Sequence, residues 1–181
     1  RLPITFPDVV GQAPLSYDHK PTGRGDDYMD HTGKPLFPFG YGLSYTSFDI
    51  GHLKLDKTAM KDTDTLVVKV DVRNDGDRAG KEVVQLYVAD RIASVRRPVK
   101  ELKGFEKVTL EAGETKTVTF TLDRRAFAFW SESLNDWLVE SGTFDILVGN
   151  SSEDIFAMAQ VEVTSGYVEP IRFTWNTTIG D

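Results

Sequence analysis

The stretch Leu66-Val67-Val68-Lys69-Val70-Asp71-Val72-Arg73 decides the fold class of this chain. Apolar residues fill every second position from Leu66 to Val72, and charged residues stand between them from Lys69 onward. Because successive side chains of a β-strand point to opposite faces, this alternation predicts a half-buried strand. Asn74-Asp75-Gly76-Asp77 follows directly, and these residue types tolerate positive φ. We therefore interpret the four residues as a hairpin turn.

The same alternation recurs outward from this stretch. Val84, Leu86 and Val88 form a second apolar row, which we expect to line the same core as the first. The opposite side of that strand, with Val83, Tyr87 and Ala89, is also fairly apolar. Further strands are predicted at 48–55 (with a bulge or bend at Gly51-His52), 102–110, 118–122, 137–139, 144–148 and 157–163, and one helical turn at 126–130.

Seven or eight short strands, separated by turn residues and without a long helix, indicate an all-β protein. We predict an immunoglobulin or fibronectin III-like antiparallel β-sandwich with an irregular N-terminal arm. The expected division is an arm at 1–47 from the end of a preceding α/β domain, a sandwich at 48–164 and a C-terminal extension at 165–181. The extension contains Tyr167, Ile171, Phe173 and Trp175, and we expect it to add an edge strand or to pack as an extension.

The arm holds six of the eight prolines and six of the fifteen glycines, which exclude long regular elements. Its many aromatic residues argue against a solvated linker, so we predict an ordered, irregular segment that lies on a surface. We expect Pro35–Phe48 to dock on the sandwich. We expect residues 8–34 to be partly mobile or to pack on a neighbouring copy. The opening Arg1-Leu2-Pro3 has no initiator Met, which we interpret as the start of a fragment.

Composition excludes several classes of protein. The chain has 181 residues, 40% of them hydrophobic and 27% charged, which is typical of a globular domain. With no cysteine, it has neither disulfides nor thiolate chemistry. A net charge of −7 argues against nucleic acid or an anionic membrane surface as a partner. No apolar run reaches the ~18 residues of a membrane helix.

The densest polar group lies in the arm, at Asp26, Asp27, Asp30 and His31. Paired carboxylates could act as acid and nucleophile in a retaining glycosidase, but neighbours in sequence usually point apart. We favour loop ordering by these side chains. Arg24-Gly25-Asp26 matches a short adhesion motif, and Arg24 could instead clamp a carboxylate.

Other candidate sites are weaker. Asn74–Asp77 lacks the spacing of a calcium loop, and His19, His31 and His52 are scattered. Trp130, Trp137 and Trp175 could stack on sugar rings, although structural roles are favoured. Asn150-Ser151-Ser152 and Asn176-Thr177-Thr178 fit the glycosylation sequon. We assign no catalytic, cofactor-binding or metal-binding residue and expect no cofactor.

Several stretches resemble family 3 glycoside hydrolases. Residues 1–7 (RLPITFP) are similar to the end of that family's second catalytic-region domain, and residues 35–48 (PLFPFGYGLSYTSF) look like its linker motif. Residues 97–108 (RPVKELKGFEKV), 114–116 (ETK) and 142–149 (GTFDILVG) resemble its C-terminal fibronectin III-like domain. Residues 11–15 and 22–24 resemble the branch with bacterial periplasmic β-glucosidases. The resemblance covers residues 1 to about 164.

The resemblance implies a non-catalytic domain that packs on the catalytic domains of the same parent protein and stabilises them. The parent would be a retaining β-glucosidase-like enzyme acting on β-glucosides or oligosaccharides, periplasmic or secreted in a bacterium. No position here matches the family's nucleophile motif or its acid/base, so we expect no hydrolysis by this chain alone. Three alternatives stay open: a carbohydrate-binding module, an adhesion-type sandwich, and a parent that is a β-xylosidase or arabinosidase.

Overall fold

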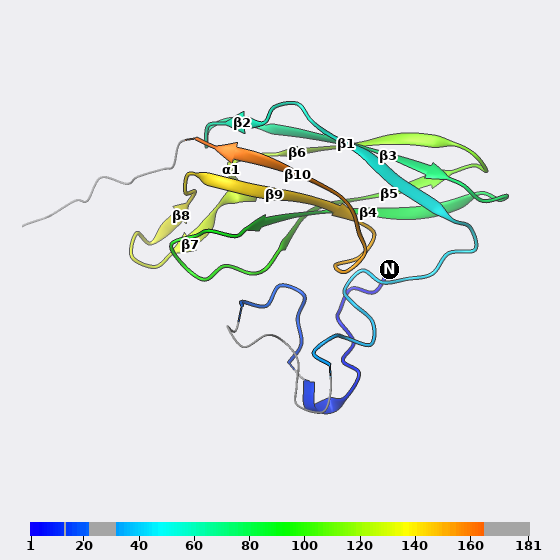
Figure 1. Ribbon diagram of the computed structural model, residues 1–181, viewed down its shortest axis with the longest axis horizontal. Helices are drawn as coiled ribbons and strands as arrows, with labels where there is room; N and C mark the ends of the chain where they lie inside the picture. The colour runs from blue at the N-terminus through cyan, green and yellow to red at the C-terminus, as the bar shows by residue number, and fades with distance from the viewer. Residues whose placement is uncertain (13, 22–31, 165–181) are drawn as a thin grey trace, which may run out of the picture.

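The computed structural model describes residues 1–12, 14–21 and 32–164, and within them two β-sheets pack face to face (Figure 1). One sheet has three strands in the order β1-β3-β6, and the other has five in the order β2-β10-β9-β4-β5. A small hairpin, β7-β8, lies apart from both. The strands are β1 (Phe48–Leu55), β2 (Ala59–Met60), β3 (Leu66–Asn74), β4 (Gly80–Asp90), β5 (Glu101–Leu110), β6 (Thr115–Leu122), β7 (Phe129–Ser131), β8 (Asp136–Leu138), β9 (Gly142–Gly149) and β10 (Ile155–Val163). The predicted all-β sandwich is confirmed.

The core is built from the two apolar rows that the sequence predicted to face each other. Leu66, Val68, Val70 and Val72 of β3 are fully buried, as are Val84 and Leu86 of β4. The two strands belong to different sheets, and their apolar side chains meet in one cluster. The space between the sheets is therefore filled in the manner expected of a sandwich.

The pairing of the strands is antiparallel with one exception. β10 pairs with the two-residue strand β2 in parallel, at Glu162 and Val163. The predicted irregularity at Gly51-His52 is confirmed, because the register of β1 against β3 shifts between Gly51 and Lys54. His52 takes up a φ of 52° there, which lets β1 bend without losing the rest of its ladder.

The turn after β3 corrects one prediction. Asn74–Asp77 does not close a hairpin, because β3 and β4 belong to different sheets and the chain crosses between them. Asn74 is fully buried, and its side-chain amide donates to the backbone oxygens of Arg78, at 2.8 Å, and Leu110, at 3.2 Å. Its side-chain oxygen accepts from Thr46 Oγ1 at 2.7 Å. Local turn chemistry predicts that the chain reverses but not which sheet it then joins.

The predicted helical turn is present but begins earlier than expected. Helix α1 spans Arg124–Phe127, and the side chain of Asp123 caps it by accepting from the amide of Arg125 at 2.9 Å. Phe129 and Trp130, expected within this turn, instead belong to strand β7. Among the described residues, no helix has the length and apolar character to cross a membrane.

The described part of the arm (blue to cyan in Figure 1) lies below the sandwich in this view and is irregular apart from the 3-10 helix η1 (Val10–Gln12). Its first residues run antiparallel to residues 37–41, with Leu2 and Phe6 donating to the oxygens of Tyr41 and Phe37, each at 2.8 Å. The side chain of Gln12 is buried and donates to the oxygens of Thr32, at 2.8 Å, and Lys34, at 3.0 Å. These bonds tie the described parts of the arm together.

Candidate functional site

The surface that seats the arm is the outer face of β4 and its neighbours. Because Val84 and Leu86 point into the core, Gln85 and Tyr87 point out of the sandwich. Both are nonetheless buried, with exposed fractions of 3% and 0%. The arm provides part of this cover: Tyr17 stands edge-on to Tyr87, and Gly40 packs against Gln85.

An aromatic stack forms the centre of this seat. The ring of Tyr17 lies on the ring of Phe39, with centroids 4.5 Å apart and planes at 24°. The Tyr17 ring meets Tyr87 edge-on at 5.8 Å and 72°. Both offset stacking and edge-to-face contact are favoured geometries for aromatic pairs. Two separate parts of the arm are thus pressed onto one strand.

Hydrogen bonds fix the arm around the stack. The backbone amides of Val99 and Ser152 donate to the oxygens of His19, at 3.1 Å, and Phe39, at 2.8 Å. The amide of Leu102 donates to the Tyr17 hydroxyl at 3.2 Å. These contacts confirm that Pro35–Phe48 docks on the sandwich. They also correct part of the expectation for residues 8–34, because Tyr17 and His19 dock as well; residues 22–31 lie outside the described part of the chain.

The polar atoms beneath the stack are paired with one another. The Tyr87 hydroxyl donates to Gln85 Oε1, and Gln85 Nε2 donates to the backbone oxygen of Asn150 at 2.7 Å. Burial raises the pKa of Tyr87, and the neighbouring Tyr17 adds to this effect. Burial also raises the pKa of Tyr17, partly offset by the hydrogen bond from Leu102. The seat therefore favours the neutral form of both phenols.

Gly40 allows the arm to approach Gln85 closely. Its φ is +83°, and a Cβ built at this position would lie 2.4 Å from Gln85 Nε2. A side chain here would be strained by the backbone conformation and would also clash. Glycine at position 40 is consequently a structural requirement of this linker stretch.

A second anchor joins the start of the arm to β4. Glu82 is buried, and its Oε1 accepts from Arg1 Nε at 3.1 Å and forms an ion pair with Arg1 Nη2. Arg1 Nη1 donates to the backbone oxygen of Gly42. One guanidinium thus connects both strands of the paired arm with the sheet.

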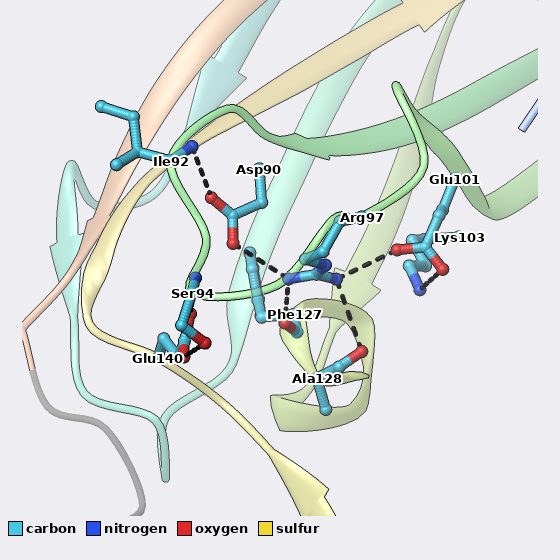
Figure 2. A network of polar contacts seen from close by, with 9 residues as sticks. All are labelled: Asp90, Ile92, Ser94, Arg97, Glu101, Lys103, Phe127, Ala128 and Glu140. Carbon is cyan, nitrogen blue, oxygen red and sulfur yellow. Dashed lines mark hydrogen bonds and ion pairs between the residues drawn. The ribbon is translucent and has the colours of Figure 1, made fainter. Parts of the chain in front are cut away.

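Arg97 organises the loop between β4 and β5, and Figure 2 shows its guanidinium among its partners. Its guanidinium is buried and pairs with Asp90 at 3.1 Å and Glu101 at 3.0 Å. It also donates to the backbone oxygens of Phe127, at 2.9 Å, and Ala128, at 3.5 Å. Because five N–H groups form a rigid fork, one arginine can hold the loop between β4 and β5 against helix α1.

Many of the residues considered for chemistry from the sequence lie outside the described part of the chain. This applies to Arg24-Gly25-Asp26, Asp27, Asp30, His31, Trp175 and Asn176. Within the described ranges, no group of three or more His, Cys, Asp or Glu side chains could hold a metal ion.

The two described tryptophans do not form a flat platform. Trp130 is 46% exposed and meets Trp137 at 72°, with ring centroids 5.7 Å apart. The guanidinium of Arg125 covers the Trp137 ring at 3.4 Å. A row of sugar rings needs coplanar aromatic faces, which this pair lacks.

The glycosylation sequon at residues 150–152 lies in the turn between β9 and β10, and its Ser151 and Ser152 are buried.

Sequence reasoning assigned no role to three residues of the seat, Tyr17, Gln85 and Tyr87, or to Arg97 in the loop beside it. One feature of the sequence pointed to the face of β4 that carries Tyr87. The second face of β4, with Val83, Tyr87 and Ala89, is too apolar for a strand open to solvent. That composition indicates a covered outer face, although it does not say which segment provides the cover.

Comparison with known proteins first identifies the type of domain. Residues 82–152 match the model of the fibronectin type III-like domain, in agreement with the sandwich described above. The chain is 54% identical over 158 residues to the thermostable β-glucosidase B of Acetivibrio thermocellus, covering 87% of this chain and 21% of that protein. It is 43% identical over 162 residues to the periplasmic β-glucosidase of Salmonella typhimurium, covering 84% and 21%.

The solved structures agree. The β-glucosidase of Listeria innocua in complex with glucose superposes with a TM-score of 0.84 at 41% identity, covering 90% of this chain and 24% of that one. The chain therefore corresponds to the part of family 3 β-glucosidases that contains their fibronectin type III-like domain. It spans about a fifth of the length of the curated relatives that it matches.

Proposed function

We propose that this chain is the non-catalytic C-terminal part of a β-glucosidase-like enzyme, and that it stabilises the preceding catalytic domains by holding them through the arm. In this proposal residues 1–47 are the linker, residues 48–164 the sandwich and residues 165–181 an extension. The parent hydrolyses O-glycosidic bonds. The kinship with β-glucosidases of about four times this length supports the proposal.

The observation that carries the proposal is a contrast within the arm. One side is fixed to the sandwich by the stack at Tyr17 and the ion pair at Glu82. Apolar side chains elsewhere in the arm stay exposed: Ile4 (55%), Val9 (45%), Val10 (92%) and Leu36 (53%). Burying apolar surface contributes about 25 cal/mol per Å² of favourable free energy, which these exposed side chains do not gain in the isolated chain. A fixed segment that exposes several apolar side chains is therefore suited to bind a partner. The partner proposed here is the preceding part of the same protein.

The test compares two settings for one substitution. Val10→Ser should leave the urea midpoint of the 181-residue chain unchanged, because Val10 is 92% exposed in it. In the full-length parent the same change should shorten the half-life of glycosidase activity at raised temperature. Lys69→Ser, at an exposed position of β3 in the other sheet, is the control and should alter neither. Equal half-lives of activity for the unmodified parent, its Val10→Ser variant and its Lys69→Ser variant would contradict the proposal.

Catalysis is proposed to reside outside this chain. The 181-residue chain should not release product from an aryl β-glucoside, whereas the parent should. Turnover by the isolated chain above a buffer blank, persisting through repurification, would overturn this part. A panel of aryl β-glucosides, β-xylosides and arabinosides assayed with the parent decides its sugar, since the alternative of a β-xylosidase or arabinosidase stays open.

Two further points belong to the proposal. The alternative of a carbohydrate-binding module predicts retention of the isolated chain in affinity gels containing soluble glucan; migration unchanged by glucan favours the structural role. A periplasmic or secreted location is proposed from the kinship with a periplasmic β-glucosidase. Fractionation of cells that express the parent with its complete N-terminus tests the location.

A further inference from the structure

The loop between β4 and β5, residues 91–100, is held in place at three points. Arg97 fixes its second half through the buried network of Figure 2. Nearer its start, the backbone amide of Ser94 donates to Glu140 Oε2 at 3.0 Å. Toward its end, the backbone amide of Val99 donates to a backbone oxygen of the arm at 3.1 Å. The loop therefore has a defined conformation although it forms no helix or strand.

Several side chains that this fixed loop presents to solvent are apolar. Ile92 is 90% exposed, Val95 48% and Val99 39%. In Figure 2 the side chain of Ile92 points away from the network around Arg97. Single exposed apolar residues are ordinary on a protein surface, but three of them on one short, ordered loop indicate a surface that binds a partner.

The charge of the loop is opposite to that of the chain. Residues 91–100 contain four basic residues and no acidic one, whereas the whole chain has a net charge of −7. Arg91, Arg97 and Lys100 each pair with a carboxylate of the sandwich. Arg96 is exposed and forms no hydrogen bond or ion pair with another described residue. The loop thus offers one guanidinium to a partner, next to the apolar side chain of Val95.

This surface continues the one proposed for the arm. The loop lies beside the arm, on the lower side of the sandwich in Figure 1, and Val99 connects the two by its hydrogen bond. The arm has the same character, because it is fixed to the sheet and still exposes Val10 and other apolar side chains. A partner that covers the exposed side of the arm therefore lies within reach of the loop.

We propose that the loop between β4 and β5 is a second docking element for the preceding domains of the parent, and that it binds a surface there with an apolar patch and a carboxylate. Ile92 and Val95 bury against the patch, and Arg96 pairs with the carboxylate, for which the arginine fork is suited. Because the loop is already ordered, docking costs little conformational entropy. The proposal rests on the proposed function, since it takes the partner of the arm as the partner of the loop.

A cross-link tests the contact directly in the full-length parent. Arg96→Lys keeps the charge and supplies an amine that a carbodiimide can join to a carboxylate in contact with it. We expect a peptide that joins residue 96 to the preceding domains of the same chain, identified by mass spectrometry. Lys69, exposed on β3 of the other sheet, is a control within the same sample and should give no such peptide.

Two results of this experiment overturn the proposal. The first is the absence of a cross-link from residue 96 to the preceding domains, or a yield no higher than that of Lys69. The second is a link formed only between two chains, detected by mixing isotopically labelled and unlabelled parent. That result assigns the loop to a second copy.

Stability supplies an independent measurement. Arg96→Glu and Ile92→Ser should leave the urea midpoint of the 181-residue chain unchanged, because both side chains are exposed in it. In the parent, each should shorten the half-life of glycosidase activity at raised temperature. Raising salt from about 0.05 M to about 0.5 M should reduce only the loss caused by Arg96→Glu, since salt screens a charge pair. Lys69→Glu is the matched charge reversal and should have no effect; half-lives equal to that of the unmodified parent in both loop variants overturn the proposal.

The failure of this proposal and that of the proposed function can be told apart. If Val10→Ser shortens the half-life of the parent and the loop variants do not, the arm docks without the loop, and only the present inference is overturned. If neither Val10→Ser nor the loop variants change the half-life, the stabilising role of the whole chain is overturned with it.

Discussion

The ring of Tyr17 stands edge-on to the ring of Tyr87, with centroids 5.8 Å apart, and joins the arm to the outer face of β4. Tyr17→Ala should therefore lower the free energy of unfolding by about 1–3 kcal/mol, since it removes a stacked ring and a hydrogen bond. Tyr45, also in the arm but 95% exposed, is the matched control. Tyr45→Ala should change stability by under about 0.5 kcal/mol. Urea melts measure the free energy of unfolding of both variants. An equal loss in Tyr17→Ala and Tyr45→Ala would show that the contact between Tyr17 and Tyr87 does not stabilise the chain.

Gly40 gives a test of the close approach between arm and sheet. Gly40→Ala should be clearly destabilising, because it combines a φ of +83° with a Cβ only 2.4 Å from Gln85 Nε2. Gly113→Ala separates the two causes, since its φ is +74° but nothing lies within 4 Å. It should cost roughly 1 kcal/mol, the strain alone. Thermal melts that rank Gly40→Ala at or below Gly113→Ala would contradict the clash.

These two positions illustrate what the sequence could and could not reveal. Period-two alternation predicted β3 and β4 and their shared core, because the burial of alternate side chains is a local property of a strand. It could not pair Tyr17 with Tyr87 or place Gly40 on Gln85, since neither contact leaves a local pattern. The hairpin expected at Asn74 failed for a related reason: turn residues fix a reversal, and long-range packing decides which sheet continues.

The candidate site, too, could be predicted from the sequence only in part. The aromatic content of the arm correctly predicted that it lies on a surface, since so many rings need cover. The contacts of Arg97 could not be predicted, because its partners come from three separate elements: β4, β5 and the end of helix α1. The acidic group at Asp26 stays a prediction, as it lies outside the described residues.

Arg97 should be one of the most sensitive charged positions of the domain. Arg97→Ala leaves the buried carboxylate of Asp90 and the backbone oxygen of Phe127 without their donor. Breaking a buried pair of this kind costs about 3–5 kcal/mol. Arg78, which is 61% exposed and pairs with the neighbouring Asp77, is the control, and Arg78→Ala should cost under about 0.5 kcal/mol. Urea midpoints that shift alike for both variants would mean that the network contributes little.

The core row of β4 should behave as a well-packed interior. Leu86 is fully buried, so Leu86→Ala should cost about 2–5 kcal/mol. Phe105 of β5 is 67% exposed, and truncating this larger residue should cost much less. Differential scanning calorimetry of both variants measures the contrast. A loss for Phe105→Ala that matches Leu86→Ala would show that the outer face of β5 is also covered.

Stability should fall at high pH because of the two phenols in the seat. Burial raises the pKa of Tyr87 and Tyr17 above their ordinary value near 10. The folded state therefore keeps these protons after the unfolded state has lost them, so the stabilisation is complete below about pH 10 and is lost as pH rises toward the folded-state pKa. Tyr87→Phe should flatten this decline, by at most about 1.4 kcal/mol per pH unit. Tyr45→Phe serves as the control, and an identical slope in both variants would exclude Tyr87 as the cause.

The antiparallel pairing of residues 2–6 with residues 37–41 closes the arm into a loop whose two ends lie side by side. Whatever the chain does between these ends, it leaves from and returns to the same place beside β4. The entropic cost of such a closure rises by only about 0.6 kcal/mol for each doubling of loop length. A change in chain length between Phe6 and Phe37 that spares the docked residues Tyr17 and His19 should therefore leave both ends of the loop in place beside β4.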